Sequence, residues 1–161
     1  MTVFGKTLSQ YLKFQQIVLM LILAVGFGRL ILSLAGVPNS ATKWLSISVV
    51  ALLGLIYYGV RVHTTGFGSY KQLLPLIFIQ SVVSQAIVIA GIAIAIFTHK
   101  DNVFSAPEFS GGGDGKTWLH AAEHLVVGLV VGPLVGWLIG SGLLFVVKKV
   151  SPQGQARGAG A

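Results

Sequence analysis

Long stretches without a charged side chain are the feature that most restricts how this chain can fold. Twenty-eight such residues separate Lys71 from Lys100, and 24 separate Glu123 from Lys148. A helix that crosses the hydrocarbon core of a bilayer needs about 20 apolar residues. Charged residues make up only 9% of the chain, against about 25% in an average soluble domain, so they are too few to cover a globular surface. We therefore expect an all-α membrane protein.

The same criterion, applied along the whole sequence, predicts four transmembrane helices in an antiparallel bundle. Their expected ranges are residues 14–36, 43–62, 72–98 and 118–147. The first two connections are short and rich in turn-forming residues, so consecutive helices should lie side by side. The long outer loop 99–117 contains a glycine run and is interpreted as a flexible tether or lid. Residues 1–150 thus form a single transmembrane domain, and residues 151–161 a disordered tail.

The N-terminus also has features of a secretory signal peptide. Lys6 and Lys13 precede an apolar run, and residues 33–35 have the small side chains of a cleavage site. However, the run contains Arg29 and continues with a second apolar stretch at residues 30–35. We therefore expect this segment to be retained as the first span.

The distribution of Lys and Arg predicts the orientation of the bundle, because short cytoplasmic loops carry an excess of them. With a cytoplasmic N-terminus, the basic residues on the inner side are Lys6, Lys13, Arg61, Lys71, Lys148, Lys149 and Arg157. The outer side then has Lys43, Lys100 and Lys116, together with all four acidic residues. We expect both termini to be cytoplasmic in a bacterial inner membrane, with membrane lipids as partners.

Composition and motif context exclude several classes of function. The chain has no cysteine, which rules out thiol catalysis, Cys-ligated zinc, iron–sulfur clusters and disulfide exchange. Its formal net charge is +7, but the basic residues are scattered and belong to no recognition fold, so we expect no nucleic-acid partner. Residues 110–117 nearly match a phosphate-binding loop. Because Ser110 replaces the first glycine and no strand precedes it, we expect no nucleotide partner.

Glycines form the strongest pattern in the fourth span. Gly128, Gly132, Gly136 and Gly140 recur every four residues, so on a helix they form one inclined row. Another helix can approach such a row closely, and close van der Waals contact holds membrane helices together. The partner is either a helix of the same chain or one of a neighbouring subunit. Pro133 interrupts the row and should bend the helix there.

Two histidines extend this row toward the outer surface. His120 and His124 are four residues apart and can hold one metal ion from one helix face. With Glu123 they spell H-x-x-E-H, the motif of the inverzincin metalloproteases, but no acidic residue follows to supply a third ligand. His99 in the outer loop is a candidate third ligand. The favoured interpretation is that the imidazoles of the fourth span form hydrogen bonds between helices.

Haem is a second candidate cofactor. Ligation by two histidines requires them on facing helices, and His99 and His120 lie at neighbouring ends of two spans on the outer side. His63 is alone on the inner side, which excludes a two-haem path across the membrane. Neither haem nor a divalent metal is favoured, so the cofactor stays unknown.

Arg29 is the single base within a span, and Glu123 is the single acid near one. An unpaired charge at the bilayer centre costs roughly 2.5–3.5 kcal/mol by insertion scales. Counted from the ends of their spans, both residues lie about 10 Å below the outer boundary, at 1.5 Å per residue. The sequence therefore predicts a buried ion pair between Arg29 and Glu123, which links the first and fourth spans.

The third span has an intramembrane polar face formed by Gln80, Ser81, Ser84 and Gln85. Polar side chains avoid lipid, so these four should point into the bundle. They either hold helices together or line a pocket for a small molecule such as a quinone.

These features favour a non-catalytic membrane protein, an accessory or self-associating subunit of a membrane complex that packs through its glycine row. One alternative is a metal- or haem-binding redox protein that uses the outer histidines. Another is a small carrier or channel lined by the polar face, Arg29 and Glu123. The shortage of polar groups in the inner halves of the spans disfavours the carrier.

Overall fold

The structure is a computed structural model that describes residues 2–151. Four helical segments are long and apolar enough to cross a membrane. They are α1 (Leu8–Leu34), α2 (Ile47–Thr64), α3 (Tyr70–Thr98) and a last segment composed of α4 (Trp118–Val126), η1 (Val127–Val131) and α5 (Gly132–Val150). The prediction of an all-α membrane protein with four packed spans is thus confirmed. Beyond Ser151, the predicted tail lies outside the described residues.

The first two helices begin where polar side chains cap them, not where the charge-free stretches begin. Helix α1 starts at Leu8 instead of residue 14, because Thr7 and Gln10 form a capping box that satisfies two backbone N–H groups. Helix α2 starts at Ile47 instead of residue 43, because Ser46 caps it there: Ser46 Oγ accepts from the N–H of Val49. Cap chemistry therefore sets these boundaries.

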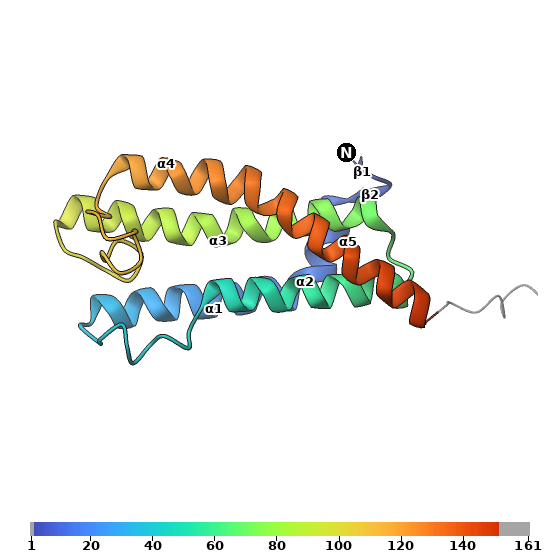
Figure 1. The fold of residues 1–161 in the computed structure, drawn as a ribbon, viewed down its shortest axis with the longest axis horizontal. Helices are drawn as coiled ribbons and strands as arrows, with labels where there is room; N and C mark the ends of the chain where they lie inside the picture. The colour runs from blue at the N-terminus through green and yellow to red at the C-terminus, as the bar shows by residue number, and fades with distance from the viewer. Residues whose placement is uncertain (1, 152–161) are drawn as a thin grey trace, which may run out of the picture.

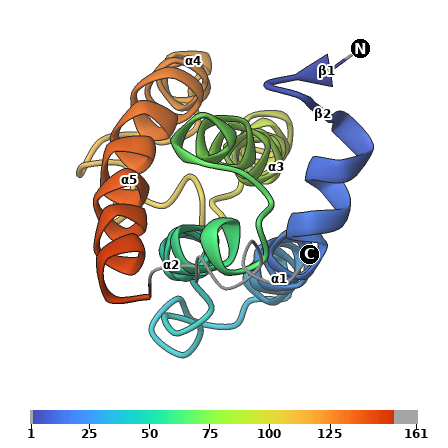
Figure 2. The same ribbon diagram turned by 90° about the vertical axis from the view of Figure 1, so that its right-hand side faces the viewer.

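The helices form one bundle in which successive spans run in opposite directions (Figure 1). Helix α3 packs against α1, α4 and α5, and α2 packs against α1 and α5 (Figure 2). The N-terminus and the end of α5 lie at the same end of the bundle, which we call the terminal end (Figure 1). Loops 35–46 and 99–117 lie at the other end, which we call the loop end.

The core is densest in the half of the bundle near the terminal end. Its side chains with at most 1% exposure include Tyr11, Tyr58, Leu73, Leu76 and Leu144, from all four spans. Without a strong hydrophobic driving force in lipid, this close packing is what holds the helices together.

A short antiparallel hairpin of β1 (Thr2–Val3) and β2 (Lys6–Thr7) covers the terminal end beside α1 (Figure 2). The hydroxyl of Tyr11 donates to the carbonyl of Val3 at 2.9 Å, and the amide of Gln72 donates to the carbonyl of Phe4 at 2.8 Å. The hairpin is thus joined to both α1 and α3.

The last span changes direction at η1, where α5 turns away from the line of α4 and crosses the bundle toward α2 (Figure 1). Pro133 has no N–H to donate to the carbonyl one turn earlier. The N–H of Gly132 reaches back to the carbonyl of Val127, so the turn before the proline is a π-helix. The bend predicted at Pro133 is therefore distributed over one wide turn.

Loop 99–117 is folded into the loop end of the bundle, which corrects its interpretation as a flexible tether. Asn102, Val103 and Ser105 are at most 2% exposed. The amide of Asn102 donates to the carbonyl of Gly91 at 2.7 Å, and the N–H of Val103 donates to Ser33 Oγ at 2.8 Å. Because side chains satisfy its buried backbone groups, an irregular segment can be packed here.

Candidate functional site

The polar face of α3 points toward the interior of the bundle. Gln80 and Ser84 are 3% and 5% exposed, and Ser81 and Gln85 are partly buried. The Gln80 amide donates to the carbonyl of Ala51 in α2 at 3.2 Å, and Gln85 Oε1 accepts from His124 Nδ1 in α4 at 2.9 Å. These side chains thus connect α3 to the helices on either side of it.

Three connected cavities surround this polar face. The first, which we call the lateral cleft, has a volume of about 420 Å³ and lies between α2, α3 and the η1–α5 segment. Its lining includes Ser48, Leu55, Gln80, Ser84, Gly132 and Ile139. The second, the arginine pocket, has a volume of about 190 Å³ and is lined by residues that include Arg29, Ser46, Ser48, Ser84, Gln85 and His124.

The third cavity, the mouth, has a volume of about 480 Å³ and lies between α4 and loop 99–117. Its lining includes Phe109, His120, Glu123 and His124. Gln85 lines all three cavities, so they adjoin this side chain, and we call the three together the hollow.

Several polar atoms beside these cavities are buried without a hydrogen-bond partner. They include Arg29 Nε, Gln80 Oε1 and Ser84 Oγ. Natural proteins pair most buried polar groups, because leaving one unpaired costs about 1–3 kcal/mol. Gln80 and Ser84 line the lateral cleft, and Arg29 and Ser84 line the arginine pocket, although these three atoms themselves have almost no accessible surface.

The predicted ion pair between Arg29 and Glu123 is not formed in the described part of the chain. Within residues 2–151, the ion pairs join Lys116 to Asp101 at 2.7 Å and to Asp114 at 3.2 Å. The Arg29 guanidinium lies over the ring of Phe109 instead, 5.1 Å from its centroid. Glu123 lies on an exposed face of α4 at the mouth. Arg29 and Glu123 therefore line different cavities, the arginine pocket and the mouth.

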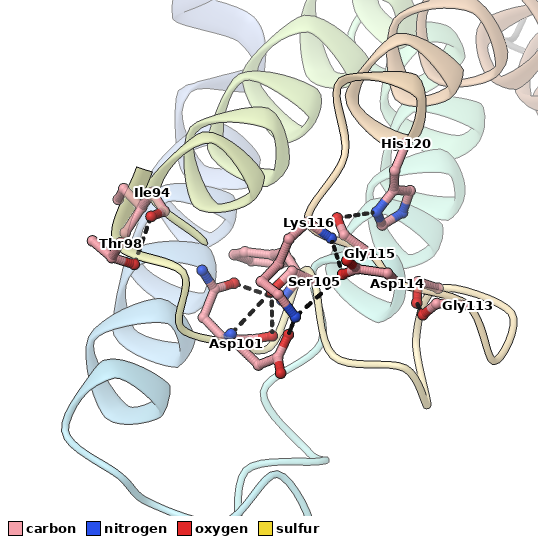
Figure 3. A network of polar contacts seen from close by, with 12 residues as sticks. Ile94, Thr98, Asp101, Ser105, Gly113, Asp114, Gly115, Lys116 and His120 are labelled. Atoms are coloured by element: carbon pink, nitrogen blue, oxygen red, sulfur yellow. Dashed lines mark hydrogen bonds and ion pairs between the residues drawn. The ribbon is translucent and has the colours of Figure 1, made fainter. Parts of the chain in front are cut away.

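The outer histidines bond to the chain itself. His120 Nδ1 is 2.9 Å from the carbonyl oxygen of Gly115, where it donates because that oxygen can only accept (Figure 3). The rings of His120 and His124 are 5.0 Å apart. Among residues 2–151, no group of three His, Asp or Glu side chains is placed to share a metal ion, so His99 does not complete a three-ligand site with them.

The glycine row lies mainly against helices of the same chain. A methyl group added at Gly128 would collide with the side chain of Gln85, and one at Gly136 would lie 3.1 Å from Ile77. At Gly140 the nearest side-chain atoms also belong to α3. Gly132 differs, because the nearest atom there is the carbonyl oxygen of Val127 in the same span. Gly132 thus leaves open space in the lateral cleft.

Sequence reasoning missed one buried polar contact near the terminal end. Gln15 is fully buried, and its Oε1 accepts from the hydroxyl of Tyr58 at 3.1 Å. The available signal was a glutamine at the second position of the first predicted span, 14–36, which the sequence analysis did not consider. It also missed Ser48 and Phe109, which line the hollow, because neither belongs to a polar pattern.

Charged residues in loop 99–117 hold the loop over the hollow. Lys116 Nζ lies between the carboxylates of Asp101 and Asp114 (Figure 3), and the hydrogen bond to Asp101 contributes most to raising the pKa of Lys116. The backbone N–H of Lys116 donates to Asp114, which lowers the pKa of that carboxyl. Asn39 donates to Glu108 at 2.7 Å and lowers its pKa in the same way.

No protein-family model matches this sequence, and no curated protein or solved structure matches it either.

Proposed function

We propose that this chain is a non-catalytic integral membrane protein that binds a lipid-like amphiphile in the lateral cleft. The observation that carries the proposal is a mostly apolar cleft of about 420 Å³ whose lining includes the polar side chains Gln80, Ser81, Ser84 and Gln85. Ligand sites typically combine an apolar lining with a few convergent polar groups.

The lateral cleft is accessible from the bilayer. Leu52 of α2 and Val135 and Ile139 of α5 line it and are 54%, 48% and 48% exposed. In a membrane such exposed apolar side chains face acyl chains. A molecule already dissolved in the bilayer can therefore reach the cleft from the side of α2 and the η1–α5 segment, without crossing water.

The polar side of the cleft favours a molecule with one hydrogen-bonding end. The Ser84 hydroxyl and Gln80 Oε1 belong to side chains that line the cleft, and both lack a partner. Alkane cannot hydrogen-bond to them, whereas a ligand carrying a hydroxyl, carbonyl or acid group can. An amphiphile satisfies the apolar and the polar surface together.

The other candidate functions receive less support. Both imidazoles of α4 are engaged with Gly115 and Gln85, which does not favour a metal or haem centre. The glycine row faces α3 and α2 of the same chain, which gives no support for self-association through it. Membership in a larger complex, the bacterial inner membrane and cytoplasmic termini stay predictions from the sequence.

The proposal predicts that purified protein retains one amphiphile for each chain. The measurement is native mass spectrometry after extraction in mild detergent and extensive washing. Gly132→Leu places a side chain in the cleft without meeting another helix, and should reduce the retained ligand roughly fivefold to a hundredfold, since overpacking costs about 1–3 kcal/mol.

The matched control is Gly142→Leu on the same helix. Nothing lies within 4 Å of a side chain added at Gly142, and the residue is exposed, so this variant should retain the ligand. Equal retention by the two variants would show that the cleft is not the binding site.

A further inference from the structure

Arg29 is the feature that the proposed cleft leaves unexplained. It lies in α1, and its guanidinium has neither an ion pair nor a hydrogen bond to any residue in the range 2–151. Within residues 2–151 its contact is with the ring of Phe109, whose centroid lies 5.1 Å from the guanidinium carbon. A cation in a membrane span without an anionic partner is energetically unfavourable, so a negatively charged ligand would stabilise Arg29.

The arginine pocket contains an excess of hydrogen-bond donors. Besides Arg29, the residues Ser46, Ser48 and Ser84 line it, and the buried Ser84 hydroxyl has no partner. Gln85 accepts at its oxygen from His124, which leaves its NH₂ group free to donate. No acidic residue lines this pocket. A group rich in acceptors and negatively charged fits this set.

The arginine pocket is continuous with the lateral cleft. Ser48 and Ser84 line both, and from there the cleft extends over Leu55, Val135 and Ile139 toward the middle of the bundle. A head group at Arg29 therefore has an apolar path for its tail. The arginine pocket, with about 190 Å³, is the smallest of the three cavities, which favours a compact head over a large one.

We propose that the ligand is an anionic lipid whose oxyanion head, a carboxylate or a phosphate, is bound by Arg29 with Ser48 and Ser84, while its tail occupies the lateral cleft. This inference rests on the proposed function and adds the chemical class of the ligand. Guanidinium binds both oxyanions through paired, charge-assisted hydrogen bonds. Glu123 stays at the mouth, outside the arginine pocket, and does not oppose the bound charge.

The test uses the full chain in phosphatidylcholine vesicles that contain equal small amounts of oleic acid, dioleoyl phosphatidic acid and dioleoylglycerol. Native mass spectrometry of the extracted protein counts each bound lipid. We expect oleate or phosphatidic acid to be enriched about tenfold or more over dioleoylglycerol, as charge-assisted hydrogen bonds imply. The two acids distinguish a carboxylate from a phosphate head, and enrichment of either supports the inference.

A parallel sample contains excess inorganic phosphate. Because the inferred ligand is held by its tail as well as its head, free phosphate should not displace it. Displacement of the lipid by inorganic phosphate would instead identify a site for a free anion and overturn the lipid assignment.

Two arginine variants test the role of Arg29. Arg29→Gln should abolish the enrichment of anionic lipid while the total number of bound lipids stays the same. The control Arg61→Gln removes an exposed arginine at the terminal end and should retain the enrichment, which excludes a general effect of net charge. Arg29→Lys keeps the charge and should retain part of the enrichment, and this variant is informative even if Arg29→Gln does not fold.

The outcomes separate this inference from the proposed function. Suppose that wild-type protein binds dioleoylglycerol and the two acidic lipids equally well, while Gly132→Leu still retains less lipid than Gly142→Leu. The inference of an oxyanion head group is then wrong, but the proposal of a ligand site in the lateral cleft is supported. If the two glycine variants retain equal amounts of lipid, both proposals fail.

Discussion

The two halves of the bundle differ in how their buried polar side chains are hydrogen-bonded. Near the terminal end, Tyr58 and Gln15 are both fully buried, and the Tyr58 hydroxyl donates to Gln15 Oε1, although Gln15 Nε2 has no partner. Near the loop end, Ser84 is 5% exposed, its hydroxyl has no partner, and it lines two connected cavities.

This difference follows from the path of the last span. Helix α5 packs against both α2 and α3, whereas α4 lies beside α3 and is separated from α2 by the hollow (Figure 2). Close packing needs helices on every side, and in the loop half one side is open. We therefore expect the terminal half to contribute more to stability, and the loop half to provide the cavities in which we propose that a ligand binds.

The largest effect is expected from a cavity in the terminal half. Leu144→Ala truncates a side chain with no exposure and should lower the free energy of unfolding by about 2–4 kcal/mol through lost packing contacts. Leu138→Ala on the same helix truncates a side chain that is 64% exposed and should have little effect. Unfolding in mixed micelles measures both, and equal losses would contradict the assignment of stability to the terminal half.

Removing one hydroxyl in each half should have different consequences. Tyr58→Phe leaves the oxygen of Gln15 without its donor and should cost about 0.5–1.5 kcal/mol. Ser84→Ala removes a hydroxyl that has no partner, so the unfolding free energy of the ligand-free protein should stay the same or rise. The same micelle titration measures both variants, and a larger loss for Ser84→Ala would mean that its hydroxyl is already bonded.

The smallest effect concerns the hydrogen bond between the two loops at the loop end. Asn39 is the main reason that the pKa of Glu108 lies below its ordinary value, so Asn39→Ala should raise that pKa, as measured by NMR of the carboxyl carbon. The pKa of Glu108 is lower in the folded state than in the unfolded state. The stabilisation from its hydrogen bond with Asn39 is therefore present at neutral pH, and it is lost as the pH falls through the ordinary pKa and then through the lowered one. An unchanged pKa in the variant would show that the loops are not joined there.

The four spans could be predicted because one physical requirement, about 20 residues without charge, is local in the sequence. The ends were less predictable. The start of α1 depends on the capping box of Thr7 and Gln10, whose residues lie outside the apolar stretch. The folded state of loop 99–117 was missed because it depends on contacts such as that of Asn102 with Gly91, which join separate segments.

The sequence predicted which polar residues belong to the candidate site but not which side chains contact one another there. Gln80, Ser84 and Arg29 were identified because polar groups are rare in spans. The partner assigned to Arg29 was wrong, since depth along a helix follows from the sequence while the direction of a side chain around it depends on packing. The hollow itself has no sequence signal, because it results from the separation of α4 from α2.

The π-helical turn at η1 has a mechanical consequence for this separation. Pro133 offers no backbone donor there, and the bond from Gly132 to Val127 closes a wider ring than its neighbours. Bending stiffness is therefore lowest at this one point of the last span. Tilting of α4 about this turn, with α5 packed against α2 and α3, would change the distance between α4 and α2 and with it the width of the opening beside the proposed ligand site.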